Sequence, residues 1–421
     1  MKVLIQQARV IDPTSSYHET IQDIIVNDGV IGKIGSIDAA DADHVITGES
    51  LHVSPGWVDI FASFPDPGYE HKETLESGSA AAAAGGFTDV FLIPNTKPVT
   101  DNKSQVEYLS NRSLPFTSRI HPLGAISRNA EGKDLAEMYD MRNSGAVAFS
   151  DGINPVQSAG LLLKALQYVK SFDGVIIQIP DDKSVGANGL MHEGIMSTRL
   201  GLAGKPLIAE ELLVARDIKL TRYADSKLHF TGVTSSKSLE YIRRAKDAGL
   251  QVTCSVTPYH LFFTDEYLTG YDSNFKVYPP LRTEADKNAL LGFVKDGTID
   301  CIATHHIPQD YDSKILEFEY AKIGMIGLET CYPVLKTVLP DVPESRWVEL
   351  LSINPRKIFA LPQPHIEENE MAVLSIYSPK GKTIIDRNFF YSKSANSPFI
   401  GQELNGKVLG IIRHKQLFLR K

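Results

Sequence analysis

The sequence has few of the residues that mark several classes of protein. Its three cysteines, Cys254, Cys301 and Cys331, are odd in number and widely spaced, which does not suit a disulfide framework or a zinc knuckle. No apolar run approaches the ~18 residues of a membrane span, and the opening MKVLIQQARVID is too polar for a secretory signal. We therefore expect a cytoplasmic protein with reduced, buried thiols and no membrane partner.

Basic residues are also fewer than acidic ones. Lysine and arginine number 43 against 51 aspartates and glutamates, which gives a formal net charge of −8, and the basic residues are scattered along the chain. Because nucleic-acid binding normally requires a basic patch or stripe, we expect no nucleic-acid partner. What the chain does have is 43% hydrophobic residues in 421 positions, enough for a large globular core.

Two patterns divide the chain. Alternation typical of short antiparallel strands occupies both ends, as in KVLIQQARVID, DIIVNDGVIGKIG and GKVLGIIRHKQLFLRK. Between them, apolar runs such as TDVFLIPN, GAVAFSDG and SKLHFTGVTS alternate with helical segments, which indicates parallel strands with helical crossovers. We predict an α/β fold with a (β/α)8 TIM-like barrel over residues 55–362. Residues 1–54 and 363–421 are expected to form one small composite β-sandwich domain.

Motifs along almost the whole chain resemble those of one enzyme family. PGWVDI, followed by DPGYEHKETLESGSAAAAAGGFTDVFLIPNTKPVTDN, is similar to the signature of dihydroorotases in the amidohydrolase superfamily. The likeness continues through LHFTGVTSSKSLEYIRRAKDAGLQVTCSVTPYHLFFTD to KSANSPFIGQELNGKV, and it extends more weakly to hydantoinases and allantoinases. The resemblance implies a two-zinc enzyme of pyrimidine synthesis that reversibly closes N-carbamoyl-aspartate to dihydroorotate, with a metal-bound hydroxide and an aspartate as proton carrier.

The residues that the resemblance would assign to the metal centre are mostly replaced. The substituted ligand and catalytic positions are Phe61, Ser63, Gln178, Gly232 and His305. Phe61 and Ser63 stand where the family has a His-x-His pair, and His305 stands in place of the catalytic aspartate. Pro65 replaces the arginine that would hold the substrate carboxylate, whereas Asp151 keeps the bridging acidic position.

These replacements remove most of the atoms that could bind zinc. Phenylalanine and glycine side chains offer no electron pair, and serine and glutamine are poor zinc ligands. A four-ligand zinc site is worth about 10–16 kcal/mol of apparent binding free energy, or on the order of 3 kcal/mol per ligand, so that losing four ligands removes most of the affinity. We therefore expect no cofactor and a homologue without its catalytic centre.

Three functions stay open at this point. The first is a non-catalytic scaffold or regulator in pyrimidine synthesis; for it the resemblance implies a homodimer and aspartate carbamoyltransferase as partner. The second is an active dihydroorotase or related cyclic amidase with a rearranged zinc site, for which Asp151, His305 and His306 are the candidate ligands. The third is a small-molecule binding module. Asn95 and Arg282 are candidate substrate-binding residues, although Asn95 equally suits a turn and Arg282 an ion pair.

Overall fold

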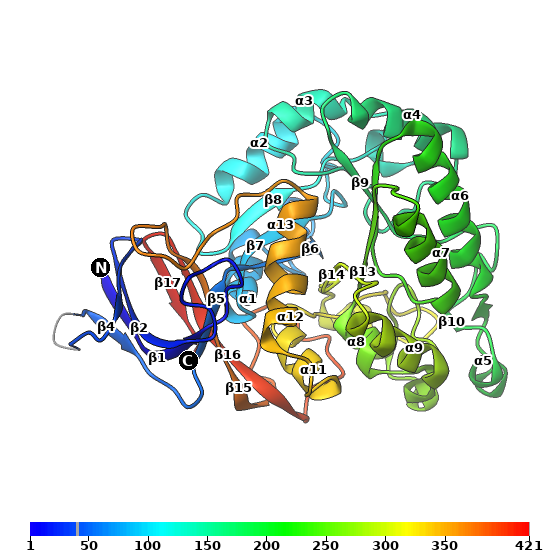
Figure 1. Cartoon of the computed structure of the whole chain (residues 1–421). Coiled ribbons are helices and arrows are strands. Elements are labelled where there is room, and N and C mark those ends of the chain that lie inside the picture. The colour runs from blue at the N-terminus through cyan, green and yellow to red at the C-terminus, as the bar shows by residue number, and fades with distance from the viewer. Residues whose placement is uncertain (39–41, 421) are drawn as a thin grey trace.

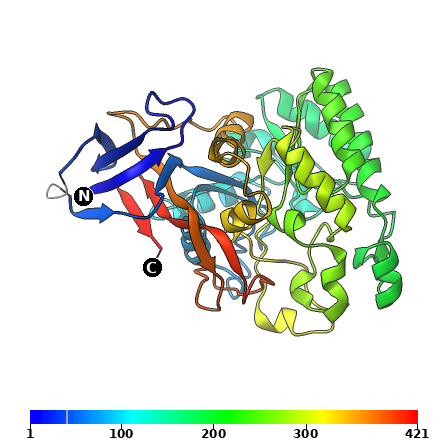
Figure 2. The ribbon, with the colours of Figure 1, turned by 60° about the horizontal axis from the view of Figure 1, so that its bottom comes forward.

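The computed structural model describes residues 1–38 and 42–420. A β-sheet module at one side adjoins a barrel surrounded by helices, and both ends of the chain lie in the module (Figure 1). A second view shows the same two parts side by side (Figure 2).

The described strands are β1 (Lys2–Val10), β2 (Ile21–Asn27), β3 (Val30–Gly35), β4 (His44–Ile46), β5 (His52–Pro55), β6 (Trp57–Ala62), β7 (Phe87–Leu92), β8 (Arg119–Pro122), β9 (Val175–Gln178), β10 (Met191–His192), β11 (Gly204–Lys205), β12 (Lys227–Phe230), β13 (Val252–Val256), β14 (Cys301–Ile302), β15 (Val373–Ile384), β16 (Glu403–Arg413) and β17 (Gln416–Leu419). The described α-helices are α1 (Leu75–Ala84), α2 (Lys103–Arg112), α3 (Met138–Asn143), α4 (Ala159–Lys170), α5 (Ile195–Leu200), α6 (Ile208–Ala224), α7 (Ser236–Asp247), α8 (Pro258–Phe262), α9 (Glu284–Lys295), α10 (Tyr311–Lys314), α11 (Cys331–Val338), α12 (Glu344–Val348) and α13 (Asn354–Ile358).

The two ends of the chain share one sheet. Its strand order is β17-β16-β15-β5-β1-β2-β3, with β4 beside β1. β15, from the C-terminal part, lies antiparallel to β5, from the N-terminal part, with Leu374 opposite Pro55 and Ile376 opposite Val53. Because successive strand residues face opposite sides, the alternating pattern places one apolar set together in a core of its own. The domain limits at residues 54 and 363 stay a prediction.

Parallel strands from the middle of the chain form the barrel. β6, β7 and β8 pair in one group, and β9, β12, β13 and β14 pair in another. Phe149 joins the groups by bridging Gly124, beyond β8, to Ile176 of β9, and Ala62 of β6 bridges His306, beyond β14. Counted over the described residues, eight parallel segments thus close into a ring, and the predicted barrel with an added β-module is confirmed.

Apolar side chains fill the inside of this ring. A buried carboxylate also ties β6 to the segment after β14, because Asp59 accepts hydrogen bonds from the backbone N–H and the hydroxyl of Thr304, at 2.7 and 2.9 Å. The interior cluster consists of Val58, Ile60, Phe61, Phe91, Ile93, Leu123, Ala148, Val175, Ile177, Ile179, Cys301, Ala303 and Phe359. The barrel is therefore a packed core, and a functional site has to lie at one of its mouths.

Helices cover the outside of the barrel, as α4, α6 and α7 do in Figure 1. α7 illustrates why the sequence folds this way: Ser235 caps it by accepting from the Ser238 N–H, and Leu239, Ile242 and Ala245, spaced by three, are buried toward the strands. The strand-to-helix order places the loops after the strands at one mouth, where barrel enzymes hold their chemistry.

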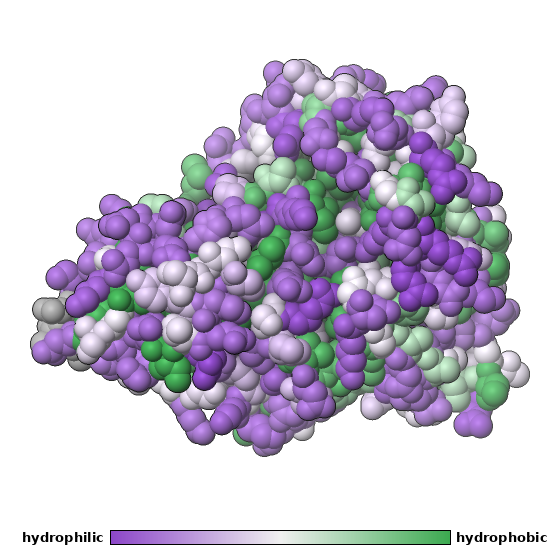
Figure 3. Space-filling view, in the orientation of Figure 1, coloured by the Kyte–Doolittle hydropathy of each residue, from purple (hydrophilic) through white to green (hydrophobic). Residues whose placement is uncertain are grey.

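The outer surface is mainly polar. On the face in Figure 3, hydrophilic residues predominate and hydrophobic ones form separate patches. None of the helices in residues 1–38 and 42–420 combines the length and the hydropathy that a bilayer crossing requires.

Candidate functional site at the barrel mouth

His305 stacks on Phe61 where β6 and β14 end. The two ring centroids are 4.4 Å apart and the planes are inclined by 31°. Nε2 of His305 lies 2.8 Å from Oγ1 of Thr231, which fixes the imidazole plane. Both rings are buried, and burial lowers the pKa of His305 to about 3. The imidazole is therefore neutral near pH 7 and packs as part of the core.

Gly232 leaves the space that this imidazole occupies. A Cβ at position 232 would lie 2.6 Å from Cε1 of His305 and 3.2 Å from Cδ of Pro279. The φ of Gly232 is +69°, a conformation that residues with a side chain rarely adopt. A histidine at position 232 thus has no room while His305 keeps its place.

Asp151 is held by the loop that follows β8. Its Oδ1 accepts from the backbone N–H groups of Ile126 and Ser127, each at 2.9 Å, and its Oδ2 accepts from the Ser127 hydroxyl at 2.5 Å. Burial raises the pKa of Asp151 to about 6. Asn95 fixes the same turn by donating to the Asp151 carbonyl, at 3.2 Å, and accepting from the Ile153 N–H, at 3.1 Å. The side chains of Asp151 and Asn95 therefore already have hydrogen-bond partners within this part of the chain.

Gln178 does not face the barrel interior. Its amide exchanges hydrogen bonds with the backbone of Val156, and its Nε2 lies 3.4 Å from Oδ2 of Asp217 on α6. Its neighbours Ile177 and Ile179 belong to the interior cluster instead. Since side chains alternate along a strand, Ile179 takes the inward position at this strand end, and that position carries no metal-ligating atom.

His306 and Ser63 belong to the junction that closes the barrel. The Ser63 N–H donates to the His306 carbonyl at 2.8 Å. Nδ1 of His306 accepts from the Gly327 N–H at 3.2 Å, and its Nε2 lies 3.6 Å from Oε2 of Glu73. Glu73 also accepts a hydrogen bond from the Ser392 hydroxyl. His306 thus pairs with Glu73 rather than with Asp151.

Arg282 is built into a buried polar network. Its Nε donates to Oγ1 of Thr234 at 2.8 Å, and its Nη2 lies 3.7 Å from Oε2 of Glu210 on α6. Nη1 also lies 3.3 Å from Nδ1 of His192. The structure therefore gives Arg282 structural partners and leaves none of these donors aimed at a substrate.

The candidate metal ligands do not converge. Zinc requires three or four imidazole, thiolate or carboxylate groups around one point. Within residues 1–38 and 42–420, no group of three or more His, Cys, Asp or Glu side chains is placed to hold a metal ion. Asp151 and His305 are hydrogen-bonded to Ser127 and Thr231, and Nε2 of His306 lies 3.6 Å from Glu73. The residues present do not fit the pair of zinc ions that the resemblance implies.

Above the interior cluster lies an open cleft of about 1320 Å³. Tyr278 forms part of its floor, since this side chain lines the cleft and also packs on the interior cluster. Its hydroxyl donates to Oδ2 of Asp181 at 2.7 Å. The cleft also carries lysines from loops after different strands, and these residues were missed in the sequence because no local motif connects them.

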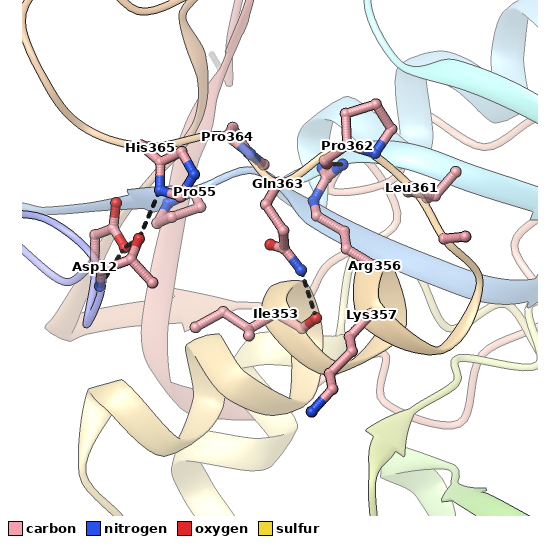
Figure 4. Close-up of a pocket in the computed structure, with 12 residues that line it drawn as sticks. Asp12, Pro55, Ile353, Arg356, Lys357, Leu361, Pro362, Gln363, Pro364 and His365 are labelled. Carbon is pink, nitrogen blue, oxygen red and sulfur yellow. Dashed lines mark hydrogen bonds between the residues drawn. The ribbon is translucent and has the colours of Figure 1, made fainter. Parts of the chain in front are cut away.

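A second cavity, of about 570 Å³, lies between the β-module and α13 (Figure 4). Nδ1 of His365 lies 2.8 Å from Oγ1 of Thr14, which in turn donates to Oδ1 of Asp12. Gln363 donates to the Ile353 carbonyl at 2.9 Å. These polar groups bond to other residues of the lining, so the cavity is a structural junction and not a set of converging reactive groups.

Buried neutral histidines predict sensitivity to acid. Nδ1 of His229 lies 2.8 Å from Oγ1 of Thr253 and Nε2 lies 3.1 Å from Oγ of Ser255, and burial lowers the pKa of His229 to about 3. The unfolded chain, with a pKa near 6.5, binds this proton first. The contribution of His229 to stability is therefore complete above about pH 6.5 and is lost as the pH falls toward 3.

We expect His229→Gln to reduce the slope of unfolding free energy against pH between about pH 4.5 and 6.5, by up to about 1.4 kcal/mol per pH unit. Urea unfolding over a series of pH values measures this slope. The control His44→Gln, at an exposed position, should leave it unchanged. An unaltered slope in the His229 variant would contradict a buried, neutral imidazole.

Comparisons with known proteins agree with the fold and with the motifs. Residues 51–238 match the family described as dihydro-orotase-like. Dihydroorotases of Syntrophus aciditrophicus and Acetivibrio thermocellus are 39% and 40% identical to this chain, over 97% and 96% of both partners. An L-hydantoinase (dihydropyrimidinase) from Arthrobacter aurescens has the same fold, with a TM-score of 0.85 at 24% identity over all of this chain and 96% of its own. The family match and the near full-length relatives show that the chain belongs to the dihydroorotase family of the amidohydrolase superfamily.

Proposed function

We propose that this chain is a non-catalytic dihydroorotase-family protein of pyrimidine synthesis, with a scaffold or regulatory role. The observation that carries the proposal is the stacking of His305 on Phe61 beside Gly232, at positions where the family resemblance predicts catalytic and metal-binding groups. A binuclear mechanism needs a metal-activated hydroxide and a Lewis acid, and the packed side chains supply ligands for neither.

The partner proposed for this role is aspartate carbamoyltransferase, and the proposed assembly of the chain itself is a homodimer. Both rest on the family resemblance. Aspartate carbamoyltransferase makes N-carbamoyl-aspartate, the compound that dihydroorotases use next, so a protein with a dihydroorotase fold is a suitable scaffold beside it.

Metal analysis combined with an activity assay tests the loss of catalysis. For protein purified without chelators, we expect no stoichiometric zinc and no cyclisation of N-carbamoyl-aspartate, even after zinc is added, because the ligand set does not converge. The dihydroorotase of Acetivibrio thermocellus, assayed in parallel, is the positive control. Two zinc ions per chain together with turnover would overturn the proposal.

The scaffold role has a separate test. Tagged full-length chain is used to capture the aspartate carbamoyltransferase of the same organism, and light scattering gives the mass of each protein and of the mixture. We expect a complex and a dimeric mass for this chain alone. Two proteins that elute separately at micromolar concentration, with unchanged carbamoyltransferase activity, would contradict the role.

One observation favours a second candidate, a small-molecule binding module. The cleft above the interior cluster is open and lined by several cations. The third possibility, a cyclic amidase with a rearranged metal site, finds no converging ligand set among the described residues.

A further inference from the structure

Three arginines surround one buried carboxylate at the end of the barrel where the strands begin, opposite the mouth. Arg119 is the first residue of β8 and lies beside Asp89 of β7 in the parallel register. Nη2 of Arg356, from α13, lies 2.7 Å from Oδ2 of Asp89. Arg413, the last residue of β16, comes from the β-module. We call Arg119, Arg356 and Arg413 the arginine cluster.

The hairpin of β16 and β17 brings Arg413 to this place. Arg413 is paired with Gln416 across the hairpin, and Nε2 of Gln416 donates to the carbonyl of Pro115, shortly before β8, at 2.8 Å. Burial lowers the pKa of Arg413, the charges of Arg119 and Arg356 lower it further, and the Asp89 carboxylate raises it. Because such effects fade over about 10 Å in salt solution, the cluster and its carboxylate form one site.

Asp89 is already fully engaged. Its Oδ2 accepts from Arg356 at 2.7 Å and from the Thr88 hydroxyl at 2.8 Å, and its Oδ1 lies 2.8 Å from Nε2 of His121. Burial lowers the pKa of His121, so this imidazole adds no positive charge near pH 7. Asp89 therefore balances Arg356 and has no oxygen left for another guanidinium group.

The other two arginines have no counter-charge of their own. Arg119 is exposed and Arg413 is half-buried, and neither side chain forms an ion pair or a hydrogen bond within residues 1–38 and 42–420. Nε of Arg413 is buried without a partner. Among the residues that the structure describes, Asp89 is the one carboxylate whose charge acts on Arg413 and on the neighbouring His414. Two positive charges are thus left uncompensated.

These charges cannot be relieved by titration or by the next basic residue. Lys415 acts on Asp28, which also holds the amino terminus of the chain at 2.8 Å. A guanidinium group keeps its proton in proteins, so Arg413 stays charged although it is partly removed from water. A partly buried charge without a partner raises the energy of the folded state, and a bound anion removes this cost.

We propose that Arg119 and Arg413 bind a phosphate group at this end of the barrel. A phosphate group carries a charge of about −1.5 to −2 at pH 7, which matches two guanidinium groups, and it accepts paired hydrogen bonds from their planar forks. A single carboxylate would leave one of the two charges unbalanced. The inference does not rest on the proposed function, because the site lies at the opposite end of the barrel from Phe61 and His305.

Calorimetric titration of the full chain tests the proposal at pH 7.5 and fixed ionic strength. The probes are inorganic phosphate and glycerol 3-phosphate, with acetate as the carboxylate comparison. We expect one saturable site per chain for at least one phosphate probe, and binding about tenfold or more weaker in Arg119→Gln/Arg413→Gln. The matched control Arg199→Gln/Arg222→Gln removes two exposed arginines of α5 and α6 and should bind as the unaltered chain does.

The stability of Arg413→Gln supplies a second readout. In phosphate-free buffer this variant should unfold at the same temperature as the unaltered chain or at a higher one, because it removes an uncompensated charge. Saturating phosphate should raise the unfolding temperature of the unaltered chain and leave that of the variant unchanged. If Arg413→Gln does not fold, Arg119→Gln, at an exposed position, is titrated in its place.

Each outcome decides for or against the site. Tighter binding of glycerol 3-phosphate assigns the site to phosphate esters, and tighter binding of inorganic phosphate assigns it to the free ion. The proposal would be overturned by the absence of saturable phosphate binding, by acetate binding as tightly as phosphate, or by equal weakening in the two double variants. Destabilised Arg413→Gln with unaltered phosphate binding would show a purely structural arginine and would overturn it as well. Circular dichroism establishes that each variant is folded.

Discussion

Replacing Phe61 by alanine is expected to lower the free energy of unfolding by about 3–5 kcal/mol. The ring of Phe61 is fully buried in the interior cluster and stacks on His305 at 4.4 Å. Deleting the ring removes its apolar burial and leaves a cavity that the surrounding strands cannot close, since β6 is held by pairing with β7 and with His306. Urea unfolding at pH 7.5 measures the loss.

An exposed aromatic residue supplies the control. Tyr223 is 75% exposed on α6, and Tyr223→Ala should change stability by about 0.5 kcal/mol or less. A loss below about 1 kcal/mol in Phe61→Ala would mean that the mouth of the barrel is loosely packed or hydrated. That result would also weaken the proposed function, because an open, wet mouth could still admit a substrate.

Replacing Arg356 by alanine is expected to cost about 3–5 kcal/mol, because it removes the guanidinium that balances the charge of a buried carboxylate at the opposite end of the barrel. Nη2 of Arg356 lies 2.7 Å from Oδ2 of Asp89 on β7 and donates to the Gly56 carbonyl at 2.9 Å. Although burial opposes it, Arg356 together with His121 holds the pKa of Asp89 well below its usual value. Without the guanidinium, Asp89 has to remain charged in the core or take up a proton.

The matched control for this pair is Lys170 and Asp225, whose charged atoms are 2.8 Å apart at the surface, with side chains 50% and 87% exposed. Lys170→Ala should cost about 1 kcal/mol or less, because water screens that pair. The double variant Asp89→Asn/Arg356→Met removes both charges. The difference between its loss of stability and that of Arg356→Ala gives the cost of leaving the Asp89 charge buried without Arg356. If Arg356→Ala costs no more than Lys170→Ala, the contacts of Asp89 with His121 and Thr88, each at 2.8 Å, or access to water must be enough to hold its charge.

Part of the candidate site could be predicted from residue type. Phe61 and Gly232 cannot donate an electron pair in any fold, so the doubt about a zinc centre followed from chemistry. The assignment of a substituted ligand position to Gln178 was less secure. Motif matching pointed to Gln178, but Ile179 is the residue that faces the barrel interior. A shift of one residue along a strand exchanges its two faces, so the motif alone could not tell which side chain points inward.

Which side chains pack into the former metal site could not be predicted from the sequence. His305 occupies the space beside Gly232 because its backbone has a φ of +44° and its ring is held between Phe61 and Thr231. None of these partners lies near it in sequence. The acidic side chain retained at Asp151 likewise found its donors in Ser127 and the backbone, and not in a histidine.

By itself, the sequence determined the kinds of elements, their alternation into a barrel with a β-module, and the shortage of metal-binding atoms. Periodicity, capping and side-chain chemistry are local properties that hold wherever a segment is placed. Only the tertiary structure decided that an aromatic pair packs the mouth of the barrel, which face Gln178 takes, and that lysines of separate loops meet in one cleft. Packing and electrostatic energies depend on distances between atoms, and these distances exist only once the chain has folded.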